Sequence, residues 1–270
     1  MVIFSATMRT LLLYDFKGNY LKKISVLHQP LEVLTLGNDL LTRNPKGFRV
    51  FADYYTFTHI DDNGEIAGRF LFHQNEKELE KQGTEIGLSA FGFNYYTHRD
   101  TVYYWESIYD TIWRILPSHE VTPEYYIDCG SKKLPGKYIT HKYAILDEEI
   151  DQYVRLSSFI TTRNLYFFNI DNLTHLTRIL YDHSTGACLV IKYSDSSSKY
   201  PIFKLYNDID GGMNYWPIGR LDDHTTFSLI NGYELKERNQ EKMSKSIREI
   251  AAKSTQLDNP IIMMVNHGKH

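Results

Sequence analysis

The sequence predicts an all-β fold, a β-propeller of four-stranded antiparallel blades that is incomplete and carries one C-terminal surface helix. Tyrosine is common, with 21 copies beside 14 Phe and 3 Trp, whereas Pro and Gly number 8 and 16. This composition favours pleated, half-buried strands. A turn from Asp15 to Gly18, between two strand-like segments, recurs from Asp61 to Gly64, 46 residues later. Because a repeat of roughly 40 to 50 residues is typical of propeller blades, these hairpins predict successive blades.

The first predicted hairpin covers residues 11–26 and has no strand pair before it. Its turn has a mechanical cause, because an Asp side chain accepts hydrogen bonds from the backbone ahead of it and Gly adopts the positive φ that the turn requires. Three four-stranded units follow in chain order. The first pairs 32–36 with 40–43 and continues into the hairpin around Asp61. The second combines 91–96, 101–105, 110–115 and 124–128, and the third 154–160, 165–169, 176–181 and 187–192.

The C-terminal part supplies a further strand pair, 213–217 with 225–230, and a short strand at 261–265. Between them, residues 234–253 predict a helix whose narrow apolar stripe places it on the surface. The stripe consists of Leu235, Met243, Ile247 and Ile250. Three charged or serine-rich connections are expected at blade rims, at 74–84, 131–149 and 193–199.

Charge and hydropathy exclude several classes of partner. The chain has 30 basic and 33 acidic residues, a formal net charge of −3, spread along its length. This balance lacks the basic patch that binds nucleic acid or an anionic membrane, so we expect neither as a partner. No window approaches the roughly 18 consecutive apolar residues of a membrane span. The N-terminus also lacks the pattern of an export signal.

Motifs of catalytic or metal-binding chemistry are not matched. Residues 87–91 approach the nucleophile elbow G-x-S-x-G but have Phe where the second Gly is needed. The segment that begins at His59 resembles a calcium loop only superficially, because Phe70 stands where a carboxylate is required. A hydrogen-bonded turn explains residues 207–212 better than a calcium site does. The 11 histidines lack metal-ligand spacing, so we expect scattered surface histidines, a frayed tail around His267, and no metal or other cofactor.

The two cysteines, Cys129 and Cys188, stand outside any C-x-x-C pattern. They predict neither a disulfide framework nor a zinc site. Each is expected to be a small buried apolar side chain in or beside a strand.

Six short segments carry a family resemblance: YDFKG at 14–18, DTVYY at 100–104, DTIW at 110–113, YIDCG at 126–130, KLP at 133–135 and DNPII at 258–262. In this order and spacing, the chain resembles six-bladed β-propeller proteins, distantly similar to NHL-repeat propellers, that Gram-negative gut bacteria export as lipoproteins. The resemblance covers nearly the whole chain. It implies a location in the periplasm or at the cell surface.

Members of that family carry an export signal, a lipidated Cys and further blades ahead of the position where this sequence starts. The resemblance therefore implies an N-terminally shortened chain, which is cytoplasmic if its start is genuine. We expect residues 1–270 to form one partial propeller domain that represents about four to five blades. Either its two incomplete ends complete each other in a small ring or the ring is open with unpaired edges, and we favour the open ring.

Propellers bind ligands in a funnel on their axis, lined by the innermost strands and adjoining loops. Here those strands are 91–96, 154–160 and 213–217. Aromatic residues near them can stack on a ligand and charged ones can meet an anion or a carboxylate, although aromatic residues in such strands mostly pack sheet against sheet. The candidate binding residues are Tyr95, Tyr96, His98, Trp105, Glu106, Arg155, Arg163 and Trp216.

These features favour a non-enzymatic binding or interaction module for a small molecule, a glycan, a peptide or a partner protein. Two alternatives stay open. An NHL-like enzyme of the lyase or lactonase type would hold an axial metal, which predicts His and acidic side chains converging there from several blades. A truncated remnant would have no independent function.

Overall fold

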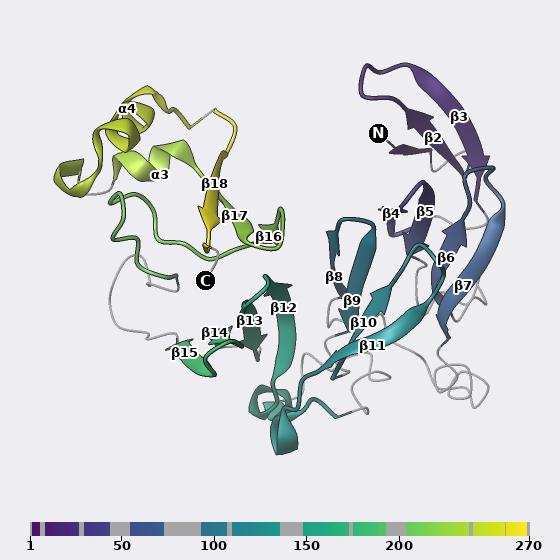
Figure 1. Ribbon diagram of the computed structural model, residues 1–270, viewed down its shortest axis with the longest axis horizontal. Coiled ribbons are helices and arrows are strands. Elements are labelled where there is room, and N and C mark those ends of the chain that lie inside the picture. The colour runs from purple at the N-terminus through teal and green to yellow at the C-terminus, as the bar shows by residue number, and fades with distance from the viewer. Residues whose placement is uncertain are drawn as a thin grey trace. The chain divides into compact units, whose positions relative to one another are not determined.

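A computed structural model describes residues 2–5, 9–26, 30–43, 55–72, 93–106, 110–135, 148–172, 175–192, 204–237, 240–256 and 258–268 (Figure 1). The chain divides into two compact units, Met1–Ile150 and Asp151–His270. Most described residues lie in antiparallel strands, which confirms the predicted all-β fold. That residues 1–270 form a single domain stays a prediction. None of the described helices has the length and apolar character that spanning a membrane requires.

Three four-stranded antiparallel sheets form where the sequence predicts blades, and in each one the strands pair in chain order. Each sheet is therefore built from local hairpins, as a propeller blade is. The first contains β4 (Glu32–Leu36), β5 (Asp39–Arg43), β6 (Tyr55–Ile60) and β7 (Ile66–Phe72). The second contains β8 (Phe93–His98), β9 (Thr101–Glu106), β10 (Thr111–Ile115) and β11 (Val121–Tyr126). The third contains β12 (Arg155–Thr161), β13 (Leu165–Asp171), β14 (Leu176–Asp182) and β15 (Ala187–Lys192).

The repeated Asp-to-Gly turns have the predicted chemistry. The Asp61 carboxylate accepts the backbone N–H groups of Asn63 at 2.9 Å and Glu65 at 2.8 Å, and Gly64 has a φ of 93°. These hydrogen bonds, with that of Glu65 the strongest, hold the pKa of Asp61 below its ordinary value. Asp15 makes the equivalent bonds in the preceding hairpin. Local side-chain chemistry thus explains why the chain reverses at both places.

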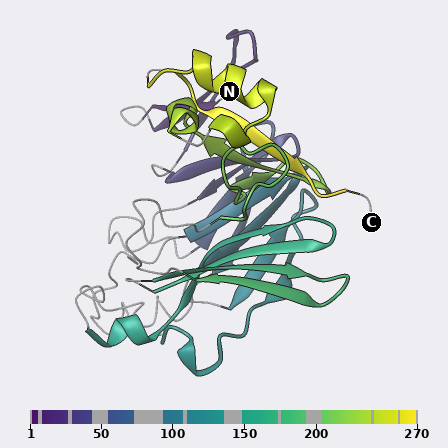
Figure 2. The ribbon, with the colours of Figure 1, turned by 90° about the vertical axis from the view of Figure 1, so that its left-hand side faces the viewer.

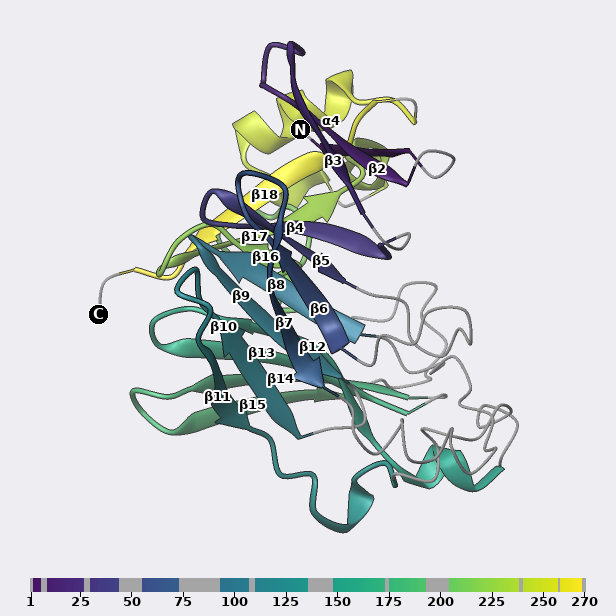
Figure 3. The same cartoon turned by 90° about the vertical axis from the view of Figure 1, so that its right-hand side faces the viewer.

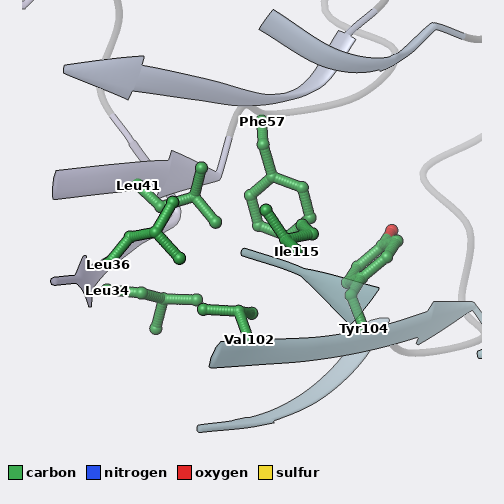
Figure 4. Packing of buried hydrophobic residues seen from close by; sticks show 7 residues of the cluster. All are labelled: Leu34, Leu36, Leu41, Phe57, Val102, Tyr104 and Ile115. Atoms are coloured by element: carbon green, nitrogen blue, oxygen red, sulfur yellow. The ribbon is translucent and has the colours of Figure 1, made fainter. Parts of the chain in front are cut away.

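A hydrophobic core joins the β4–β7 and β8–β11 sheets, whose strands are labelled in Figure 3. Leucine and Phe57 side chains of one sheet face the side chains of the other (Figure 4). Phe57 and Tyr104 meet edge to face, with ring centroids 4.7 Å apart, an arrangement worth roughly 0.5–1.5 kcal/mol beyond the area it buries. The core residues are Leu34, Leu36, Leu41, Phe57, Val102, Tyr104 and Ile115.

The N-terminal hairpin belongs to a three-stranded sheet of β1 (Val2–Ser5), β2 (Thr10–Tyr14) and β3 (Tyr20–Ser25). No strand pair precedes this hairpin in the described residues, but a single strand that the sequence did not predict, β1, pairs with β2. A four-residue strand is too short to show a recognisable alternation of apolar and polar residues. Leu11 and Ile24 of this sheet cluster with buried residues of the β4–β7 sheet.

The last sheet contains β16 (Gly219–Arg220), β17 (Thr225–Ile230) and β18 (Ile261–Asn266). The predicted strand at 213–217 is wrong, because β17 pairs with Gly219–Arg220 instead. The apolar run there is explained by burial, with Tyr215 and Trp216 both enclosed. Pro217 lacks the N–H that a ladder needs, and residue 215 makes only an isolated bridge to Leu205.

The helical segment is confirmed but is divided into α3 (Gly232–Lys236), a 3-10 turn at Gln240–Lys242 and α4 (Lys245–Lys253). Ser244 separates them, because its hydroxyl accepts the N–H of Ile247 and starts α4 as an N-cap. Leu235 and Met243 pack with residues of β17 and β18. The two helices lie beside β18 (Figures 1 and 2).

Both cysteines are free. Cys188 is exposed on β15, the last strand of its sheet, so its expected burial is wrong. Cys129 is half-buried and precedes a 3-10 turn at Gly130–Lys132, and a second such turn covers Glu148–Gln152. The predicted connections at 74–84 and 193–199, most of 131–149, and the segment 87–91 lie outside the described residues.

Candidate functional site

The eight candidate binding residues fall into two groups. The first unit holds five of them on β8 and β9, and the second unit holds the other three on or near β12 and the segment before β16. That all eight line one axial funnel stays a prediction. The first group consists of Tyr95, Tyr96, His98, Trp105 and Glu106, and the second of Arg155, Arg163 and Trp216.

The aromatic residues of the first group pack within their own sheet. Tyr96 stacks on Tyr103 of the neighbouring strand, with ring centroids 4.6 Å apart and planes within 8°. Trp105 approaches the edge of Tyr96 at 6.5 Å. Tyr96 and Trp105 are 8% and 2% exposed, and His98 is buried as well. These rings therefore pack against each other inside the sheet, and their faces are not open for a ligand to stack on.

Glu106 is held by a tyrosine that the sequence analysis did not single out. The hydroxyl of Tyr104 donates a hydrogen bond of 2.7 Å to Glu106 Oε1, and both side chains are buried. Burial, together with the negative charge of Glu106, raises the pKa of Tyr104 well above its ordinary value. Tyr104 therefore stays protonated at neutral pH and keeps Glu106 in place.

An ion pair that the sequence analysis missed lies on the facing sheet. Arg43 Nε donates to Glu32 Oε2 at 2.8 Å across β4 and β5. Arg43 is buried and Glu32 is half-buried. Half-buried Tyr95 interacts electrostatically with both groups. Its burial, followed by the negative charge of Glu32, raises the pKa of Tyr95, while the positive charge of Arg43 lowers it. We call Tyr95, Tyr104, Glu106, Glu32 and Arg43 the Tyr95 cluster.

The sequence contained one signal for this ion pair. Glu32 begins the strand β4 and Arg43 ends the strand β5, so a short hairpin places them directly opposite each other. Opposite charges at such positions attract across a sheet. Their proximity to Tyr95 depends on how two sheets pack, which no local pattern reports.

In the second unit, Trp216 is buried and makes two specific contacts. Phe167 meets its ring edge to face at 5.5 Å, and the guanidinium of Arg178 lies 5.2 Å above it. Arg155 is engaged in an ion pair with Asp171 on the neighbouring strand. Of the eight candidates, Arg163 is the one classed as exposed, and its backbone N–H donates to a carbonyl of the loop before β17.

The turn at residues 207–212 and two histidines were also the subject of predictions. Residues 207–212 form a hydrogen-bonded turn, as predicted, in which the Asn207 amide donates to Asp210 at 2.7 Å. The expected frayed tail is wrong at His267, whose Nε2 lies 2.8 Å from Thr226 Oγ1. Burial lowers the pKa of His267. His59 contradicts the expectation of surface histidines, because it is fully buried in β6.

Comparison with known proteins supports the fold. The family described as "Domain of unknown function (DUF4934)" matches residues 1–266. Among curated proteins, none matches the chain. A protein of Bacteroides fragilis NCTC 9343 described as exported is 16% identical, with a TM-score of 0.65 over 98% of this chain and 73% of its own.

Two further solved structures are more distant. A member of the DUF4221 family from Bacteroides vulgatus ATCC 8482 is 12% identical, with a TM-score of 0.45 over 71% of this chain and 63% of its own. Virginiamycin B lyase from Staphylococcus aureus is 12% identical, with a TM-score of 0.34 over 73% of this chain and 56% of its own. The likeness to the Bacteroides fragilis protein concerns the fold alone, and the other two carry no argument. A six-bladed ring and lipidation stay predictions.

Proposed function

We propose that this chain, which belongs to the DUF4934 family of domains of unknown function, is an exported, non-enzymatic binding module whose ligand docks at the Tyr95 cluster. The similar Bacteroides fragilis protein described as exported supports the proposed location. Two packed sheets supply a rigid frame, and rigid frames are where proteins commonly position binding residues.

One observation carries this proposal: charged side chains stand at the edge of an interface that is otherwise apolar. Leu34, Leu41 and Phe57 fill the middle of the interface, while Arg43 and Glu32 form their ion pair at its end. A buried ion pair is weak support for stability, because apolar side chains of similar size often stabilise a fold equally well. Groups with perturbed pKa values cluster at functional sites, and Tyr95 and Tyr104 near this ion pair both have a raised pKa.

The chemistry of the cluster suits a neutral, hydroxyl-rich ligand such as an oligosaccharide. The half-buried side chains of Tyr95 and Glu32 offer a donor and an acceptor, so a sugar hydroxyl can both accept and donate there. The opposite charges of Arg43 and Glu32 offset each other, which gives no preference for a charged ligand. Glu106 already accepts the Tyr104 hydrogen bond, which favours binding over proton transfer to a substrate.

The proposal is tested by screening the protein on an oligosaccharide array and titrating the tightest-binding glycan calorimetrically. Loss of one hydrogen bond to a charged group costs roughly 1.5–3 kcal/mol, so Glu32→Gln should weaken binding by about tenfold or more. Tyr95→Phe should weaken it by a smaller factor. Tyr20→Phe is the control, because Tyr20 is exposed on β3 outside the cluster, and it should bind like the unmodified protein.

Three results would contradict the proposal. The array gives no specific glycan, the two cluster variants bind as tightly as the Tyr20 control, or the unmodified protein cleaves the glycan during the titration. The last result would favour the enzyme alternative.

A further inference from the structure

A second polar cluster lies at the opposite end of strand β5 from the Tyr95 cluster. Asp39 begins β5, His59 lies on β6, and His119 lies in the turn between β10 and β11. One donor atom from each of the three side chains falls within 4.8 Å of the other two. We propose that Asp39, His59 and His119 bind a divalent metal ion, best matched by zinc, that joins the β4–β7 sheet to the β8–β11 sheet.

The surroundings of His59 favour a bound cation. Its side chain is 0% exposed, and its Nε2 lies 2.8 Å from Asp39 Oδ2. Its Nδ1 is buried with no hydrogen-bond partner among the described residues. When Nδ1 carries the ring proton, the lone pair of Nε2 faces the carboxylate oxygen, and a cation held by both atoms makes this approach favourable.

The backbone at His119 gives an independent indication. The Leu116 N–H donates to Glu120 O and the His119 N–H donates to Leu116 O, both at 3.0 Å. The turns that contain Gly18 and Gly64 make the same pair of bonds. Their left-handed position is occupied by glycine, with φ values of 86° and 93°, whereas here His119 occupies it with a φ of 70°.

A side chain in this conformation is strained, and such strain is concentrated at functional sites. The His119 ring lies 4.2 Å from the His59 ring, measured between centroids. Phe70 stacks on His59 at 6.2 Å and lies 6.5 Å from His119. Glycine would serve the turn without strain, whereas histidine at this position places an imidazole against the His59 ring.

The donor set selects the ion. Two imidazoles and one carboxylate are ligands that zinc accepts in tetrahedral sites, whereas calcium and magnesium prefer oxygen donors alone. Three protein ligands leave a fourth tetrahedral position, and His119 is exposed, so solvent can reach the ion. The ligands come from both packed sheets, so a bound ion would stabilise their contact.

The test is calorimetric titration of tag-free, chelator-treated protein with zinc chloride, together with melting curves in zinc and in EDTA. We expect one zinc ion per chain and a melting temperature that zinc raises and EDTA restores. Changing the hydrogen-bond partners of metal ligands weakens metal sites about 10- to 100-fold, so changing a ligand itself, by Asp39→Asn or His119→Gly, should weaken zinc binding at least tenfold. Cobalt(II) should give a visible absorption band that both variants lose.

His119→Gly separates metal binding from folding. Glycine relieves the strained turn, so the metal-free variant should melt no lower than the metal-free parent protein while losing the effect of zinc. His183→Ala is the control, because His183 is exposed in the β14–β15 turn of the second unit, and it should bind zinc normally. The proposal fails if no zinc binds, if iron(II) or magnesium is bound in preference, or if His119→Gly binds zinc like the parent. None of these outcomes depends on glycan binding at the Tyr95 cluster.

Discussion

Polar side chains of the first unit gather at the two ends of strand β5. Arg43 ends this strand and joins Glu32 and Tyr95, whereas Asp39 begins it and joins His59. Leu41 lies between them in the apolar core. Polar groups tolerate burial only where partners satisfy them, which explains why they occupy the margins of the interface. The two ends thereby acquire different chemistry, one suited to hydroxyl groups and the other to a metal ion.

A single residue of the second unit makes a pH dependence testable. The Tyr215 hydroxyl is buried and hydrogen-bonded to Thr226, and burial raises its pKa from 10.0 to about 12. The folded state therefore holds this proton more tightly than the unfolded state. The stabilising effect is complete below pH 10 and is lost as the pH rises from 10 toward 12. Tyr215→Phe should remove this part of the alkaline loss of stability.

The measurement is urea unfolding of the parent protein and of Tyr215→Phe at pH 9 and pH 11. The lost hydrogen bond lowers the stability of the variant at both values, so only the difference between them reports the titration. If both proteins lose the same stability between pH 9 and pH 11, the alkaline loss does not come from the titration of Tyr215.

At the scale of elements, the helical segment shows how one side chain sets a boundary. The apolar spacing over residues 234–253 is compatible with one helix, yet Ser244 accepts the Ile247 N–H at 3.3 Å and starts α4. Serine is a preferred N-cap because its oxygen satisfies an N–H that the first helical turn leaves unpaired. Ser244 was visible in the sequence as a possible N-cap, but the prediction of one helix followed the apolar spacing instead.

Ser244→Ala should lower the stability of the second unit by about 1 kcal/mol. Hydrogen exchange of the α4 amides, followed by urea unfolding, measures the effect. Ser244→Asp is the matched control, since Asp caps helices as well as Ser does, and it should retain the protection. Unchanged amide protection in Ser244→Ala would show that packing against β17 and β18 alone holds α4.

At the scale of the whole molecule, facing sheets depend on large side chains between them. Phe57 is 0% exposed in the core between the β4–β7 and β8–β11 sheets. Phe57→Ala should lower the free energy of unfolding by about 3–5 kcal/mol, because the lost ring leaves a cavity. Phe16→Ala should change it by less than about 0.5 kcal/mol, since Phe16 is fully exposed in a turn.

Urea unfolding of these two variants also tests the prediction of one domain over residues 1–270. A single domain unfolds in one cooperative transition, and Phe57→Ala should shift that whole transition. Two separate transitions, with only the first shifted, would show that the units Met1–Ile150 and Asp151–His270 unfold independently.

Features that depend on neighbouring residues could be predicted from the sequence. Three four-stranded sheets and the turns at Asp15 and Asp61 formed where expected, because strand propensity and turn chemistry act over a few residues. The strand predicted at 213–217 failed for the converse reason. Its apolar residues reflect burial, and burial alone does not distinguish a strand from an enclosed loop.

The sequence by itself determined the all-β class of this protein and the hairpins of its three four-stranded sheets. The tertiary structure alone decided that β1 extends the N-terminal hairpin, that Glu32 and Arg43 lie beside Tyr95, and that Asp39, His59 and His119 meet. The reason is physical: backbone pairing in a hairpin follows local chemistry, whereas contacts between sheets follow from the packing of many side chains far apart in the chain.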